Sequence, residues 1–236
     1  AIEEARERDV PCELVSCFMG AHAVPTDYED RREAYLDLVC NEMIPRVADA
    51  GLADYCDVFC DSGAFDVDEA ERVLRTGQNY GMTARIHADE LSDSGGAMLA
   101  TQLGAASADH LEFVSDEAIH KMAAEEVTAV LMPLVNQYLH TTDTPAPARE
   151  LLDAGCEVAL ASDFNPGSAM TQDLGLVMNL ACTMYGLTPG EALRGVTIGG
   201  AKALDRQDIG RLEPGTKADV TRSEERRVGK ECIVKC

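Results

Sequence analysis

Two kinds of pattern alternate along the chain. Short apolar runs rich in Val, Ile, Leu and Cys are separated by longer stretches whose apolar residues recur at spacings of three and four. Such short runs are typical of buried strands, and the longer stretches of amphipathic helices. We expect strands over 13–19, 56–60, 84–88, 109–114, 127–132 and 157–162. We expect helices over 28–50, 66–80, 94–104, 115–125, 146–154 and 171–186.

Glycines agree with these helix ends, since Gly51, Gly81, Gly104 and Gly155 each follow a predicted helix. Strands that alternate with helices of this length predict βα units and a parallel sheet. About six units are visible, whereas a (β/α)8 barrel has eight units and about 250 residues. We therefore predict an α/β fold, an incomplete (β/α)8 barrel made of its last six βα units. The alternative is an open doubly wound sheet, but no Gly-rich phosphate turn follows an early strand.

The composition and the net charge limit the kinds of molecule that the protein is expected to bind. The 236 residues are 46% hydrophobic and 26% charged, which is typical of globular proteins. Lys and Arg number 20 against 42 Asp and Glu, a formal charge of −22. Such a field repels phosphate, so we expect neither nucleic acid nor an anionic membrane as a partner. The nine cysteines are odd in number and include no CxxC pair, so we expect reduced thiols and a cytoplasmic protein.

The two ends of the chain differ from the rest. The first residue is Ala rather than Met, so we expect the chain to begin inside a longer protein. Residues 221–236 are rich in Lys and Arg within an otherwise acidic chain, and we exclude them from the fold as a non-family tail. We expect a partial barrel over 1–208 and the start of a return strand to a small β domain over 209–220.

Polar residues fall where the predicted strands end. In a βα barrel the reactive groups lie at the carboxyl ends of the strands. His22, His87 and His110 lie at or near such ends, and Asp163 follows the last buried strand. An ionised Asp there is costly to bury without a cation or several donors. Imidazoles and carboxylates that converge on one barrel mouth suit zinc or iron, which would support metal-assisted hydrolysis.

Two segments next to these residues could also take part in catalysis or in substrate binding. Glu90 lies three residues after His87 and could shuttle a proton to a leaving nitrogen. The alternative is that Glu90 is a solvated loop acid. Asn165, Gly167 and Ser168 form a turn after Asp163 that could offer N–H groups and an amide to an anionic substrate. The alternative is that this turn only connects a strand to a helix.

Seven segments of the chain resemble one known family. They are GAHAVP, GLADYCDVFCDSGAF, HADEL, GAASADHLEFVSDEAI, ALASDFNPGS, MNLAC and IGRLEPGTKADV, and they span most of residues 1–220. Together they resemble imidazolonepropionase, of the amidohydrolase superfamily. The resemblance implies a metal-dependent (β/α)8 barrel, a homodimer, and hydrolysis of 4-imidazolone-5-propanoate to N-formimidoyl-L-glutamate in histidine degradation.

The resemblance also implies roles for individual residues. His87 and Asp163 match metal ligands, for one zinc or iron ion (Zn2+, Fe2+ or Fe3+) per subunit. Asp163, helped by His110, would accept a proton, and Glu90 would support its transfer to the departing ring nitrogen. The positions that match substrate contacts are His22, Glu90, Asn165, Gly167 and Ser168.

The chain departs from the family in one way that concerns the metal. The family's first two ligands form a His-x-His pair, and none occurs here. We expect these two ligands, and an Arg and a Tyr that contact substrate, in a missing N-terminal part. Two alternatives to the lactam hydrolase therefore stay open: another amidohydrolase such as a ring deaminase, or a truncated barrel without activity.

Overall fold

The computed structural model describes residues 4, 12–141 and 143–220. The prediction for 221–236 lies outside the described residues. Six parallel strands form one sheet in sequence order. They are β1 (Cys17–Ala21), β2 (Tyr55–Cys60), β3 (Thr83–Ala88), β4 (Ser107–His110), β5 (Thr128–Leu131) and β6 (Val158–Leu160).

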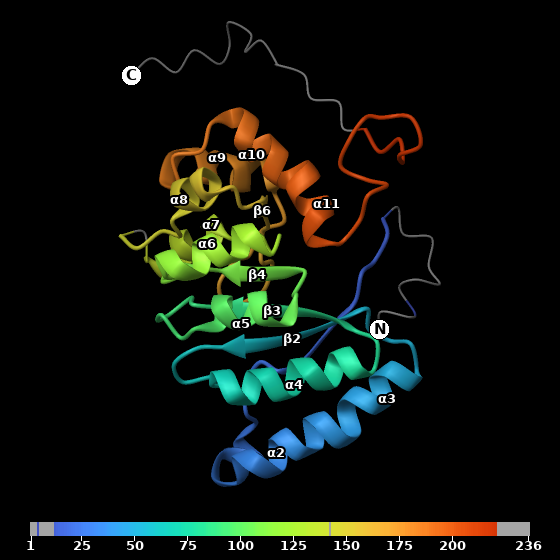
Figure 1. Cartoon of the computed structure of the whole chain (residues 1–236). Coiled ribbons are helices and arrows are strands. Elements are labelled where there is room, and N and C mark those ends of the chain that lie inside the picture. The colour runs from blue at the N-terminus through green and yellow to red at the C-terminus, as the bar shows by residue number, and fades with distance from the viewer. Residues whose placement is uncertain (1–3, 5–11, 142, 221–236) are drawn as a thin grey trace, which may run out of the picture.

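Helices connect consecutive strands, so each unit lies beside the next as the colour runs from blue to orange (Figure 1). The first connection holds η1 (Thr26–Arg31), α2 (Arg32–Leu38), η2 (Val39–Met43) and α3 (Ile44–Asp49). The next ones hold α4 (Val67–Asn79), α5 (Gly96–Leu103), α6 (Asp116–Ala124), α7 (Pro133–Leu139) and α8 (Ala148–Ala154). After β6 come α9 (Leu174–Met184), α10 (Pro189–Arg194), η3 (Gly195–Gly199) and α11 (Gly200–Ala203). The predicted βα fold is confirmed, as six units of a barrel.

The strand expected over 109–114 was wrong at both ends, since β4 spans Ser107–His110. The chain leaves the sheet there because His110 and Leu111 both adopt left-handed backbone conformations, with φ of 79° and 73°. The first strand begins later than expected, at Cys17. Residues 209–220 form turns and bends and no return strand in the described structure. Instead, Arg206 and Lys217 bond to Glu13 near the start of β1.

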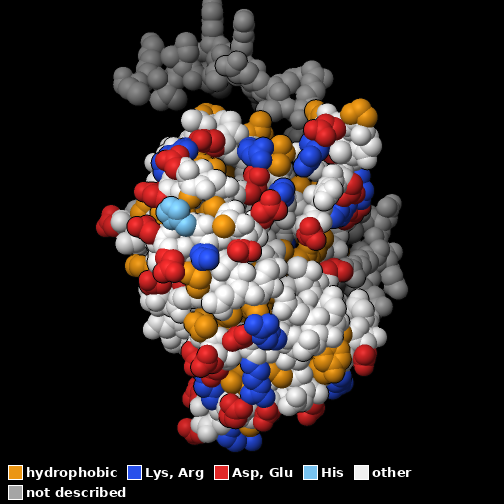
Figure 2. Space-filling model, viewed as in Figure 1, with side chains coloured by type: hydrophobic (Ala, Val, Ile, Leu, Met, Phe, Trp, Pro, Cys, Tyr) orange, Lys and Arg blue, Asp and Glu red, His pale blue; other side chains and the backbone are white. Residues whose placement is uncertain are grey.

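Successive side chains along each strand point either into the core under the helices or into the interior of the barrel. Val58, Ile86 and Ala108 point outward into one large apolar core beneath the helices. Their neighbours in sequence, such as Asp57, His87 and Asp109, point the other way, toward the interior of the curved sheet. Acidic side chains are scattered among fewer basic ones over the outer face in Figure 2. No helix among the described residues is long and apolar enough to cross a membrane.

The first prediction concerns the close contact between η3 and the sheet. A Cβ at Gly199 would overlap the backbone of Val158 and Ala159, both in β6. We expect Gly199→Ala to lower the free energy of unfolding by about 1–3 kcal/mol through overpacking, as measured by urea denaturation. Gly190→Ala in α10 is the control, because a Cβ there meets no atom within 4 Å. An equal loss in both variants would contradict the close contact.

Candidate active site

Three imidazoles meet where the first strands end. His22 follows β1, His87 lies near the end of β3, and His110 ends β4. The His87 ring centroid lies 5.3 Å from that of His22 and 5.2 Å from that of His110. The His22 ring also stacks on Phe59 of β2, with centroids 5.3 Å apart. The structure therefore brings together the three histidines that the sequence predicted.

Two carboxylates flank His87 inside the sheet. The Nδ1 atom of His87 lies 2.9 Å from Oδ1 of Asp57, which fixes the ring through a buried hydrogen bond. Asp109 is the register partner of His87 on β4. One ligand atom from each of Asp57, His87 and Asp109 lies within 4.8 Å of the others. All three side chains are buried.

The polar groups around His87 have the chemistry that a metal site needs. Oδ1 of Asp109 is buried and has no hydrogen-bond partner among the described residues, which is costly unless a cation or proton balances it. Carboxylate oxygens and imidazole nitrogen are ligands that zinc and iron accept. Burial alone would lower the pKa of His87, but Asp57, Asp109 and Asp163 outweigh it and raise that pKa to about 9. A bound cation would take the place of the proton that these acids hold on the ring.

Glu90 and His110 form a second pair at the mouth. Oε2 of Glu90 lies 3.7 Å from Nε2 of His110, which is too long for a hydrogen bond in this state. Burial raises the pKa of the Glu90 carboxyl. Burial, with His87 and His22 nearby, lowers the pKa of His110 to about 3. A neutral imidazole thus faces a carboxyl group that holds a proton more readily than usual, which suits proton exchange between them.

The turn after β6 is held by its own side chains. Oδ1 of Asn165 accepts the N–H groups of Gly167 and Ser168, at 2.8 and 2.9 Å. Nδ2 of Asn165 and the Ser168 hydroxyl both donate to Oδ2 of Asp163, at 3.1 and 3.2 Å. These contacts orient Asp163, whose charge acts on the pKa values of His87 and His22. The two N–H groups expected to face a substrate are therefore used within the turn.

Backbone strain gathers at the same mouth. Among the described residues, seven other than glycine have positive φ. Four of them lie at or shortly after a strand end at the site: Asp89, His110, Leu111 and, three residues after β6, Asp163. Left-handed conformations cost such residues roughly 1–2 kcal/mol each, so the surrounding contacts must hold them in place.

Two buried acids hold the loop that carries Glu90. Asp61, at the end of β2, accepts the N–H of Leu91 at 2.8 Å and the hydroxyl of Ser92 at 2.7 Å. Asp89 accepts the N–H groups of Gly96 and Ala97 at the start of α5, both at 3.1 Å. The Glu90 backbone is therefore fixed on both sides.

Another buried network begins at Tyr185, directly after α9, and ends at Glu112. The Tyr185 hydroxyl donates to Oδ1 of Asn136 at 2.6 Å, and Nδ2 of Asn136 donates to Oε1 of Glu112 at 3.1 Å. Oε2 of Glu112 is buried and has no partner within the described part of the chain. Burial, with smaller contributions from Glu90 and Asp61, raises the pKa of Glu112 to about 7.

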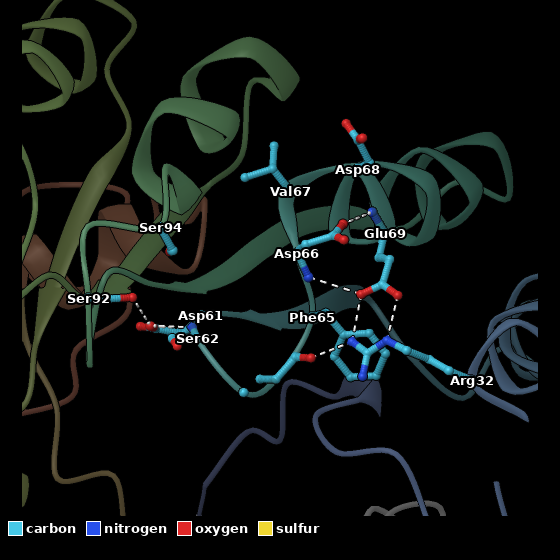
Figure 3. Close-up of a pocket in the computed structure, with 12 residues that line it drawn as sticks. Arg32, Asp61, Ser62, Phe65, Asp66, Val67, Asp68, Glu69, Ser92 and Ser94 are labelled. Carbon is cyan, nitrogen blue, oxygen red and sulfur yellow. Dashed lines mark hydrogen bonds and ion pairs between the residues drawn. The ribbon is translucent and has the colours of Figure 1, made fainter. Parts of the chain in front are cut away.

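Two cavities open beside the mouth. One, of about 540 Å³, is lined by His22, Phe59, Leu91, Arg32 and the turn 62–64, among others. The other, of about 640 Å³, is lined by Asp61, Ser92, Ser94 and the start of α4, among others (Figure 3). Arg32 and the turn 62–64 line both cavities.

Sequence reasoning missed several groups that shape the site. Asp57 and Asp109 lie inside apolar strands, and only the period of two could have shown that they share a face with His87. The roles of Asp61 and Asp89 depend on the path of the loop after β3. Asn136 lies on α7, a helix that the periodicity did not reveal, and Tyr185 is 49 residues away from it.

The chain is similar to known hydrolases. A model of the amidohydrolase family matches residues 28–226. The chain is 50% identical over 211 residues to the imidazolonepropionase of Geobacillus thermodenitrificans, covering 89% of this chain and 49% of that one. It is 46% identical over 218 residues to an imidazolonepropionase of Streptococcus gordonii, covering 92% of this chain and 70% of that one. The chain spans about half the length of most of these curated relatives.

Solved structures share the fold. An adenosine deaminase from Xanthomonas campestris with bound zinc superposes with a TM-score of 0.63 at 22% identity, covering 85% of this chain and 50% of that one. A triazine hydrolase variant gives a TM-score of 0.68 at 20% identity, covering 92% of this chain and 54% of that one. At such identities the likeness shows the architecture and nothing about the substrate.

The raised pKa of Glu112 leads to a prediction about how the stability of the fold depends on pH. Its pKa in the folded chain, about 7, lies above the ordinary value of 4.5, so its contribution to stability is complete below pH 4.5 and is lost as the pH rises through 7. Glu112→Gln keeps an oxygen for Asn136 and cannot ionise. We expect this variant to exceed the parent by on the order of 2 kcal/mol at pH 8 and to match it near pH 4.5, in urea denaturation. The exposed Glu117→Gln is the control, and an equal gain at both pH values would refute the explanation.

Proposed function

This chain belongs to the amidohydrolase family, and on that premise we propose that it forms the site of an imidazolonepropionase. The proposed reaction opens the ring amide of 4-imidazolone-5-propanoate to give N-formimidoyl-L-glutamate. The observation that carries the proposal is the convergence of His22, His87 and His110 at one mouth, with Glu90 3.7 Å from His110. Identities of 46–50% to imidazolonepropionases support the choice of substrate.

His87 and Asp163 are the proposed metal ligands, for one zinc or iron ion. When bound, such an ion polarises a carbonyl and lowers the pKa of water that it holds. Asp57 then serves His87 as a carboxylate that fixes the ring through Nδ1 and leaves Nε2 available. Nε2 of His87 has no hydrogen bond to any residue that the structure describes, which agrees with this use of the ring.

The remaining residues either transfer protons or position the substrate. Asp163 is the proposed proton acceptor for the attacking water, and the neutral His110 assists it. Glu90, whose pKa burial raises, supports delivery of a proton to the departing ring nitrogen. His22, held flat on Phe59, positions the ring, and the turn of Asn165, Gly167 and Ser168 forms the wall beside Asp163.

A chimera tests the proposal directly. Residues 12–220 would replace the matching segment of the Geobacillus thermodenitrificans imidazolonepropionase, which supplies the other half of the protein. We expect the chimera to convert 4-imidazolone-5-propanoate, followed by loss of substrate absorbance and by mass spectrometry of the product. Asp163→Ala in the chimera should reduce turnover at least about 1,000-fold, as loss of a group central to proton transfer does.

The matched control is Asp173→Ala, which removes only the cap of α9. A folded chimera without turnover would refute the function, as would full activity of the Asp163→Ala variant. Release of ammonia from a ring substrate such as guanine or cytosine, without lactam cleavage, would favour a deaminase.

Asp57 makes a separate prediction about metal binding. Asp57→Asn keeps the size of the side chain but loses the charge beside His87, so the ring is held less firmly. We expect the affinity of this chain for Zn2+ to fall roughly 10–100-fold, measured by competition with a chromophoric chelator. Asp66→Asn, at the start of α4, is the control. Unchanged affinity in Asp57→Asn would exclude Asp57 from any role at the metal.

A further inference from the structure

Two buried acids flank His87 in the interior of the sheet, and one of them has an unpaired oxygen. Asp57 on β2 and Asp109 on β4 are only 4% and 5% exposed. Asp57 accepts a hydrogen bond from Nδ1 of His87, but Oδ1 of Asp109 has no hydrogen-bond partner among the described residues. A carboxylate oxygen buried in this way is costly unless a cation or a proton balances it.

The nearby arginine does not bond to these acids. Arg85 on β3 is the register partner of Asp57 and lies on the same face of the strand as His87. Its guanidinium lies over the Tyr55 ring, 4.2 Å from the centroid, and Nη2 donates to the carbonyl of Ala203. Within the described structure no hydrogen bond joins Arg85 to either acid, so its charge is near them without occupying their oxygens.

The three side chains lie close enough together for one small cation. One ligand atom from each of Asp57, His87 and Asp109 lies within 4.8 Å of the others, and no other three His, Cys, Asp or Glu residues in the described ranges do so. Two atoms that bind one zinc ion at about 2.1 Å are at most about 4.2 Å apart, so the group must close by no more than about 0.6 Å. Rotation of Asp109 can supply this, because its Oδ1 gives up no hydrogen bond.

The ring nitrogen distinguishes this group from the metal site proposed at the mouth. Nδ1 of His87 lies 2.9 Å from Oδ1 of Asp57, so it is the nitrogen that faces the acids. The proposed catalytic ion uses Nε2 instead, and Asp163 is its only other ligand among the described residues. The inner group supplies three ligands and two negative charges. Two carboxylates and an imidazole are a ligand set that Zn2+ accepts.

We propose that Asp57, Asp109 and Nδ1 of His87 form an inner site for a divalent transition-metal ion such as Zn2+. As the ion binds, both carboxylates and Nδ1 form bonds to it, and the Nδ1 proton passes to solvent. The hydrogen bond between Asp57 and His87 breaks in the same step. An inner ion therefore removes the contact that fixes the ring for the use of Nε2. This site does not depend on the proposed hydrolysis.

The zinc affinity of the 236-residue chain tests the site, measured by competition with a chromophoric chelator. Asp109→Asn should weaken binding at least about tenfold, because loss of a ligand costs no less than loss of an outer-shell partner. Asp163→Asn should leave the affinity unchanged, since Asp163 is not part of the inner group. Asp116→Asn, at the exposed start of α6, is the control for loss of one acidic charge. Asp57→Asn does not discriminate, because Asp57 serves an ion on either nitrogen.

The bound nitrogen can also be identified in the unaltered chain, so the test does not depend on how the variants fold. With Cd2+ in place of Zn2+ and isotope-labelled histidine, NMR coupling between metal and nitrogen shows which ring atom binds. The His87 signals are assigned by their loss in His87→Gln. We expect coupling to Nδ1.

Three results would overturn the proposal. They are coupling to Nε2, no coupling to His87 at all, and loss of zinc affinity in Asp163→Asn but not in Asp109→Asn. None of them affects the proposed hydrolysis, which the chimera tests independently.

Discussion

The register of β2, β3 and β4 places charged groups inside a sheet whose outer face is apolar. Side chains point to alternate faces along a strand. Because Val58 and Ile86 pack outward against the helices, Asp57 and His87 point inward. The parallel pairing then sets His87 beside Asp109 and Asp57 beside Arg85. A shift of one residue in any of these strands would expose the core and dissolve the site together, so the fold and the site depend on the same constraint.

The buried charges in this interior depend on one another. Asp57 bonds to His87 and pairs in register with Arg85 of β3, and Arg85 is itself held by the Tyr55 ring, 4.2 Å away, and by the carbonyl of Ala203 in α11. The charged groups from Arg85 to His87 therefore lie next to one another in the sheet, and Arg85 is anchored to α11. Removing one member would leave an uncompensated buried charge, which is far costlier than the pair is stabilising.

The sequence predicted the histidines more readily than the acids that control them. His22, His87 and His110 could be found because strand ends in a parallel sheet share one edge. The strand over 109–114 could not be bounded, because the left-handed turn at His110 and Leu111 is imposed by tertiary contacts rather than by local preference. The network of Tyr185, Asn136 and Glu112 joins three segments far apart in sequence, and a single sequence contains no signal for such a pairing.

Because the sheet is curved, the carboxyl ends of its strands surround one site instead of lying in a row. In a flat sheet, β1 and β6 would lie about 24 Å apart, at about 4.8 Å for each step between strands. Interactions between charges are largely screened beyond roughly 10 Å. Yet Asp163, after β6, acts on the pKa of His22, after β1. The twist and tilt of parallel strands thus bring the two edges of the described sheet across from each other. A carboxylate from the last unit can then act in the same small space as an imidazole from the first.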